Sequence, residues 1–132
     1  MSHTVHSKPN LQDVKFVCKA FEALGWKVVP ATTCRSWAAA DAIKKYAFVA
    51  KNPQIGSNGY DVGLVPEKGG VRFEHESMLP VDSIFGKGFS LLKQEYAKLK
   101  IIDQVESNHG TYGLEKLANG IIQIEVEMDV LV

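Results

Sequence analysis

Apolar residues recur with a helical period in two stretches of the chain. In the first, Asn10 is placed to act as an N-cap and Gly25 to end the helix. The apolar positions between them recur every three or four residues: Leu11, Val14, Cys18, Phe21 and Leu24. In the second stretch the same spacing links Phe89, Leu92, Tyr96, Leu99 and Ile102, and residues 108–110 supply a stop. Each stretch therefore predicts an amphipathic helix that needs an apolar surface to cover.

Elsewhere the polar and apolar positions alternate with a period of two, which is typical of half-buried strands. The alternation is strictest from Ile122 to Met128, and Asn119–Gly120 predicts a hairpin that pairs this strand with residues 112–117. A second hairpin is expected at Glu67–Gly70, between strands over 60–64 and 71–76. Further extended segments are expected over 3–8, 26–29 and 46–51, and Pro30 is expected to close the second of them.

Two segments are harder to interpret from their residues. Ala31–Lys45 fits either a loop or a short helix capped by Ser36, and Met78–Gly88 reads as a connection rich in turn formers. The elements then follow the order β-α-β, a meander, and α-β-β. This order predicts a single α+β domain over 1–132, an elaborated ferredoxin-like sandwich. Its two amphipathic helices would pack on one face of a mostly antiparallel sheet of about six or seven strands. The other face, carrying Gln123, Glu125 and Glu127, would be wet or a partner surface.

Composition and charge narrow the possible partners. Of the 132 residues, 45% are apolar and 23% charged, which is close to the average of globular domains. Fifteen basic residues balance fifteen acidic ones, so the basic stripe of a general nucleic-acid binder is not expected. The densest basic group, Lys93, Lys98 and Lys100, is interrupted by Glu95 and Asp103 and is interpreted as the solvated face of a helix.

The cysteines and the start of the chain indicate a reducing compartment. Cys18 and Cys34 lack the CxxC spacing of a redox or zinc site, and the first residues are polar rather than a secretory signal. No apolar run is long enough to span a bilayer. We therefore expect a cytoplasmic protein with free thiols and no membrane contact. Cys18 should be a buried structural thiol, and Cys34 should lie in a loop.

Four segments together resemble a known family. They are residues 1–3 (Met-Ser-His), the helix end at 21–26, the strand at 58–64 (Asn-Gly-Tyr-Asp-Val-Gly-Leu) and the helix at 92–98. They are similar to the hypothetical chloroplast reading frame thirty-five family, small proteins of cyanobacteria, plastids and some phages with no assigned activity. The regions 37–45 and 77–88 and the ending at Met128–Asp129 depart from that family's pattern, so the chain resembles a diverged member, and a phage is one of the sources that this resemblance implies. The resemblance implies a fold and an intracellular setting, either the cytoplasm, the plastid stroma or a phage host's cytoplasm, and it supplies no catalytic residues.

No metal, cofactor or catalytic motif stands out. His3 and His6 lie three apart on a predicted strand and would point to opposite faces, so they could not chelate one ion together. The glycine pairs Gly56-x-x-Gly59 and Gly86-x-Gly88 match neither a Walker nor a dinucleotide fingerprint. GxSxG, HExxH and Cys-His arrangements are absent from the sequence. We therefore predict neither a metal nor a cofactor.

Five residues are candidates for binding. Arg35 and Trp37 fall in one loop and are residue types that dominate interface energetics, although Trp37 could equally pack under the loop. Tyr60 and Asp61 lie in the strand that carries the family resemblance, where Asp61 could simply be the polar half of the alternation. His75 stands between two glutamates and would need a cross-strand partner such as Asp61 to act chemically.

These observations favour a binding or adaptor domain over an enzyme. It would act through contacts with another protein or with a second copy of itself, using a sheet face, a sheet edge or the loop around Arg35. Single-stranded nucleic acid is an alternative partner, since Tyr60, Phe73 and Tyr112 lie in strands and could stack bases. A small enzyme that uses Asp61 and His75 together with Lys87 is a second alternative.

Overall fold

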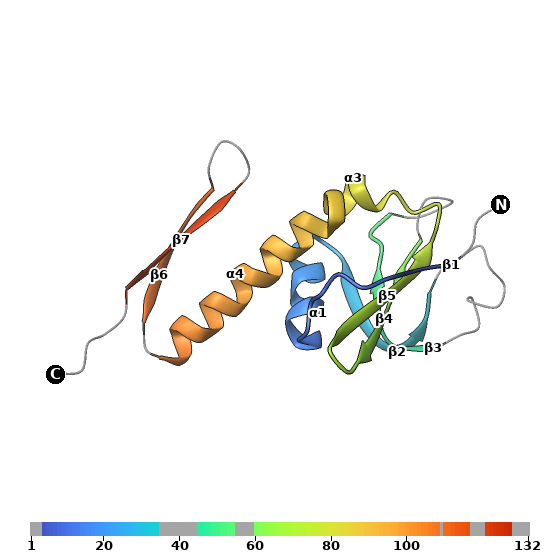
Figure 1. The fold of residues 1–132 in the computed structure, drawn as a ribbon, viewed down its shortest axis with the longest axis horizontal. Coiled ribbons are helices and arrows are strands. Elements are labelled where there is room, and N and C mark those ends of the chain that lie inside the picture. The colour runs from blue at the N-terminus through green and yellow to red at the C-terminus, as the bar shows by residue number, and fades with distance from the viewer. Residues whose placement is uncertain (1–3, 35–44, 55–59, 109, 117–120, 128–132) are drawn as a thin grey trace.

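The computed structural model describes residues 4–34, 45–54, 60–108, 110–116 and 121–127. It shows a mixed α+β fold in which every strand pairing is antiparallel. Five strands form one sheet in the order β1-β5-β4-β3-β2, and two more form a separate hairpin (Figure 1). The strands of the sheet are β1 (Thr4–Ser7), β2 (Lys27–Thr33), β3 (Lys45–Lys51), β4 (Val62–Glu67) and β5 (Gly70–Glu76), and those of the hairpin are β6 (Thr111–Lys116) and β7 (Ile122–Glu127).

The first helix, α1 (Val14–Ala23), crosses from one edge of the sheet to the other, because it connects β1 with β2. It begins later than the sequence predicts. Asn10 has a positive φ of 64° and lies outside the helix, so the expectation of a cap there is wrong. Asp13 is the N-cap instead, and its side chain accepts a hydrogen bond from the backbone N–H of Lys15 at 3.1 Å.

The expected break at Pro30 is also wrong, because β2 continues through this residue to Thr33. Pro30 pairs with Phe48 of β3, and β2 is the last strand of the sheet. An edge strand needs hydrogen bonds on one side only, so a residue without an N–H is tolerated there. Of the uncertain segment 31–45, residues 31–33 therefore belong to β2, and 35–44 lie outside the described residues.

The connection after β5 contains two helical segments that the sequence pattern does not predict. They are α3 (Val81–Phe85) and the 3-10 turn η1 (Lys87–Phe89). The long helix α4 (Ser90–Ser107) follows and packs chiefly on α1. Phe89 joins η1 to α4 in the left-handed conformation, with φ 62°. Such backbone is uncommon for a bulky side chain, and Phe89 holds it while packing on Phe73 and Phe85.

The core lies between the sheet and the two long helices. Phe21 of α1 is fully buried and touches Trp26, Phe73 and Phe85 at ring-centre distances of 5.9, 5.5 and 5.4 Å. Edge-to-face and tilted contacts of this kind add to the stabilisation that burial provides. Leu92 links the start of α4 to the same cluster.

The C-terminal hairpin stands apart from the five-stranded sheet. In Figure 1 it lies beyond the far end of α4, on the side away from α3 and the sheet. From the sequence we expect β6 and β7 to extend the main sheet. This expectation is wrong, because among the described residues the two strands pair only with each other. Gln123, Glu125 and Glu127 therefore do not form the second face of the main sheet. That face carries Glu74 and Glu76, which are both buried.

Candidate functional site

The hairpin has one apolar and one acidic face. Leu114 pairs with Ile124, and Tyr112 with Val126, so these positions share a face of the ladder. The intervening positions carry the acidic residues Glu115, Glu125 and Glu127 on the other face. Leu114 keeps 49% of its surface exposed and Val126 keeps 45%. The apolar face is thus only partly covered.

The end of α4 lies against the hairpin. Both strands of the hairpin contact α4, and Val105 near its C-terminus is buried. The backbone N–H of Gly110 donates to the carbonyl of Val105 at 2.8 Å, which fixes the point where the chain leaves the helix. The described strands of the five-stranded sheet lie toward the other end of α4, away from the hairpin (Figure 1).

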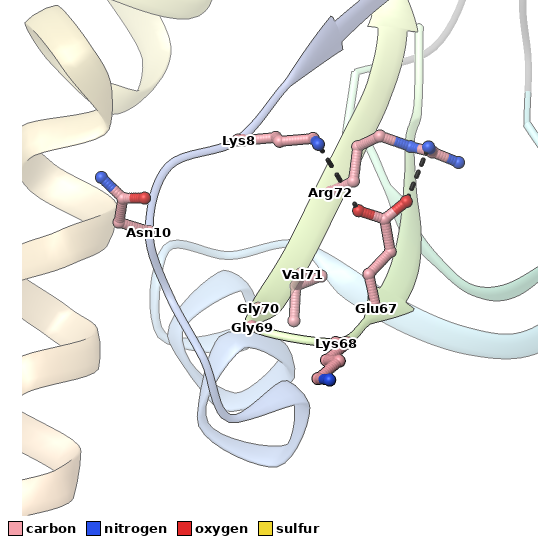
Figure 2. A pocket seen from close by; sticks show the side chains of 8 residues that line it. All are labelled: Lys8, Asn10, Glu67, Lys68, Gly69, Gly70, Val71 and Arg72. Atoms are coloured by element: carbon pink, nitrogen blue, oxygen red, sulfur yellow. Dashed lines mark ion pairs between the residues drawn. The ribbon is translucent and has the colours of Figure 1, made fainter.

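A small hollow lies between the segment after β1 and the β4–β5 turn. Figure 2 shows Glu67 between Lys8 and Arg72, with the Asn10 side chain turned away from them. The Arg72 Nη1 atom lies 2.6 Å from Glu67 Oε1, and the Lys8 Nζ atom lies 4.0 Å from Glu67 Oε2. Arg72 also reaches Glu74, with Nη2 at 3.3 Å from Oε2.

This hollow is not suited to a substrate. Its volume is about 90 Å³, far below the roughly 300–1,000 Å³ typical of small-molecule sites. Its glutamate also offsets the charge of the two cations that could attract an anion. A larger hollow of about 360 Å³ is lined mainly by apolar and uncharged side chains, among them Tyr60, Met78 and Ile84.

His75 lies on the β1–β5 pair and is 6% exposed. Its Nδ1 atom is 3.0 Å from the carbonyl oxygen of Glu76, which can only accept, so Nδ1 carries the proton. The neutral ring then accepts at Nε2 from the Ser7 hydroxyl, 3.3 Å away. Burial lowers the pKa of His75 below its ordinary value, while the backbone bond to Glu76 opposes this shift. Ser7 carries no signal in the sequence that marks it as a partner of His75, because only the register of β1 against β5 brings the two together.

Asp61 is a buried anchor rather than the solvated half of an alternating strand. It is 1% exposed, and its Oδ1 accepts the backbone N–H of Asn52 at 2.9 Å. The Lys51 ammonium lies 3.3 Å from Oδ2 and also donates to the carbonyl of Thr33 at 2.7 Å. Asp61 thereby ties the end of β3 to the start of β4.

Asp61 and His75 do not meet across the sheet. Gly63 and Glu74 are cross-strand partners and share a face, and Asp61 lies two positions before Gly63 on that face. His75 is one position beyond Glu74 and lies on the opposite face. The pair that the enzyme hypothesis requires is therefore not formed by these two strands.

The other candidate residues are placed as follows. Arg35 and Trp37 lie outside the described residues. Tyr60 is half-buried beside the core, and the pKa of its hydroxyl is raised by desolvation and by the charge of Glu76. Phe73 is completely buried, so it cannot stack on a nucleic-acid base. Phe73 therefore cannot take part in the base stacking that the nucleic-acid hypothesis assigns to it.

No group of three or more His, Cys, Asp or Glu side chains within the described residues could hold a metal ion. No helix in that part of the chain is long and apolar enough to cross a membrane. Comparison with family models, with curated proteins and with solved structures found no match for the chain.

Proposed function

We propose that this protein is a binding domain that associates with a second copy of itself through the apolar face of the β6–β7 hairpin. The observation that carries the proposal is the exposure of Leu114 and Val126 on a two-stranded hairpin that lies away from the main sheet. An isolated two-stranded hairpin is at best marginally stable in water, and it gains stability when its apolar face is covered.

A second copy suits this face because the face is self-complementary. In a two-fold dimer the same patch meets itself, and apolar side chains such as Leu114 and Val126 need no opposite charge on the partner. Stacked sheets pack about 10 Å apart, which would bury Leu114 and Val126 against their counterparts. The acidic face with Glu115, Glu125 and Glu127 would remain in water.

Hydrogen exchange tests this proposal on the hairpin itself. If the hairpin is covered by a second copy, its amides should exchange slowly in concentrated protein and faster after dilution. The amides of β4 and β5, which lie in the main sheet, serve as the internal control and should not respond to dilution. Hairpin exchange that is equally fast at all concentrations would contradict the proposal.

We also infer a remote relationship to the hypothetical chloroplast reading frame thirty-five family and an intracellular setting. The support is the sequence resemblance together with the order of elements. A ferredoxin-like origin belongs to the same proposal, and the support for it is an antiparallel sheet with both long helices in one core. Three strands, rather than one, lie between β1 and β2, so the split β-α-β unit would be an elaborated one.

A further inference from the structure

Three lysine ammonium groups gather around one aromatic ring where α1 crosses α4. The Nζ atoms of Lys15, Lys19 and Lys100 lie 5.6, 5.5 and 5.9 Å from the centre of the Phe16 ring. Lys100 also lies 5.6 Å from the centre of the Tyr96 ring. We call Lys15, Lys19 and Lys100 the lysine cluster.

The lysine cluster has no carboxylate partner within the part of the chain that the structure describes. None of the three ammonium groups forms an ion pair with a carboxylate of the described residues. Glu22 and Asp103 each lie three residues from a member of the cluster without pairing with it. Lys98, two positions from Lys100, behaves differently, because its Nζ lies 2.6 Å from Oε2 of Glu95.

The arrangement costs stability in the free protein. Lys15 and Lys19 are four residues apart on one helix, where like charges repel each other. Lys15 also lies in the first turn of α1, at the end of the helix that favours negative charge.

The two rings hold the ammonium groups in place. The Phe16 and Tyr96 rings meet edge to face, with 6.4 Å between their centres. The Tyr96 hydroxyl oxygen accepts a hydrogen bond from the backbone N–H of Asp13, at 3.0 Å. Attraction between a cation and the face of a ring offsets part of the repulsion. Phe16 is 6% exposed, so the rings position the lysines and are not themselves a surface for stacking.

We propose that the lysine cluster binds an anion with adjacent phosphate groups. Lysine ammonium groups are compact point charges that bind phosphate oxygens, and three of them match a ligand that carries several negative charges close together. Such a ligand is either a free oligophosphate or the backbone of single-stranded nucleic acid. The site is separate from the hairpin, so it does not depend on self-association.

Binding of two probes, measured on the full chain, tests this site. Inorganic triphosphate is titrated by calorimetry, and a fluorescein-labelled oligothymidylate is titrated by fluorescence anisotropy. For the oligonucleotide, three neutralised phosphates predict a slope near −2 in log affinity against log salt. Affinity should therefore fall about 20-fold between about 50 mM and about 200 mM salt.

The deciding variant is Lys15→Gln/Lys19→Gln/Lys100→Gln, and its control is Lys27→Gln/Lys45→Gln/Lys87→Gln. The control removes the same charge from exposed lysines in β2, in β3 and next to α3. The site is supported if the first variant loses binding at least 10-fold while the control keeps it, and the probe that binds identifies the source of the phosphate. Equal loss in both variants, or no binding of either probe at low salt, overturns it. Tighter binding of a polyglutamate peptide than of triphosphate would assign the surface to an acidic protein segment and overturn the phosphate assignment.

Discussion

Ser7 and His75 are joined across the β1–β5 pair, with the serine hydroxyl 3.3 Å from Nε2 of the buried ring. The ring can accept this bond only while it is neutral, because Nδ1 already donates to the Glu76 carbonyl. Protonation of His75 would turn Nε2 into a donor, so that the Ser7 hydroxyl oxygen would have to accept, and it would place a charge in a desolvated site. The stability of the sheet edge is therefore tied to pH.

We predict that the free energy of unfolding falls as the solution is acidified below pH 6.5. Burial holds the folded pKa of His75 below the ordinary value of 6.5, so between these two values the unfolded chain binds more protons. The contribution of neutral His75 to the free energy of unfolding is fully present above pH 6.5, and it is lost as the pH falls from 6.5 through the folded pKa of His75. Urea unfolding at about pH 8 and about pH 5 measures it. The variant His75→Gln should show a smaller drop, and an unchanged drop would contradict the assignment.

Asp61→Ala should destabilise the protein by about 2 kcal/mol, because it removes an acceptor from the buried N–H of Asn52 and a partner from Lys51. Asp61→Asn keeps an oxygen for Asn52 and should lose less. Asp103→Ala, at an exposed position of α4, is the control and should stay within about 0.5 kcal/mol of the wild type. Chemical denaturation gives all three values. Equal stability of Asp61→Ala and the control would show that Asp61 is not an anchor.

Gly63→Ala should cost about 1–3 kcal/mol through overpacking. A Cβ at this position would lie 2.7 Å from two atoms of the buried Tyr46 ring. Tyr46→Leu in the same chain should recover part of the loss, and a double-mutant cycle measures this coupling. Gly113→Ala is the matched control, since nothing lies within 4 Å of its added methyl group. Strictly additive costs at Gly63 and Tyr46 would contradict the contact.

The Cys18 thiol should react slowly. Burial and the charge of Glu22 raise its pKa from 9.0 to about 11, so at about pH 8 it carries roughly 100-fold less thiolate than an ordinary cysteine. Iodoacetamide labelling followed by peptide mass spectrometry distinguishes Cys18 from the buried Cys34. The same thiol in urea-unfolded protein should react at the ordinary rate. Similar rates in the folded and unfolded states would contradict this prediction.

Much of the fold follows from local patterns. Both amphipathic helices and both pairs of hairpin strands lie where the apolar period indicates, because that signal depends on neighbours in sequence. The predicted turn at Asn119–Gly120 lies outside the described residues. The cap of α1 was predicted at the wrong residue, since Asn10 and Asp13 are both good caps and only the tertiary path selects one. Pro30 predicts the end of a strand, and this prediction is wrong because the sequence does not reveal that β2 lies at the edge of the sheet.

The candidate site was harder to predict, because it depends on long-range register. The sequence identifies Asp61 and His75 as notable but not that they face opposite sides of the sheet, which the pairing of Gly63 with Glu74 decides. The lysine cluster joins Lys100 to two lysines about eighty residues earlier and requires the crossing of α1 and α4. The alternating strands predicted the hairpin correctly, but not its place outside the main sheet.

The central claim, self-association through the hairpin, is tested most directly by the molar mass of the protein in sedimentation equilibrium. The wild type should behave as a dimer whose mass falls on dilution, and Leu114→Glu/Val126→Glu should be a folded monomer. The control Met78→Glu/Leu91→Glu changes two exposed apolar residues, one between β5 and α3 and one in the first turn of α4, and should remain dimeric. A wild type that is monomeric at every concentration, or a hairpin variant that dimerises as well as the control, would contradict the account.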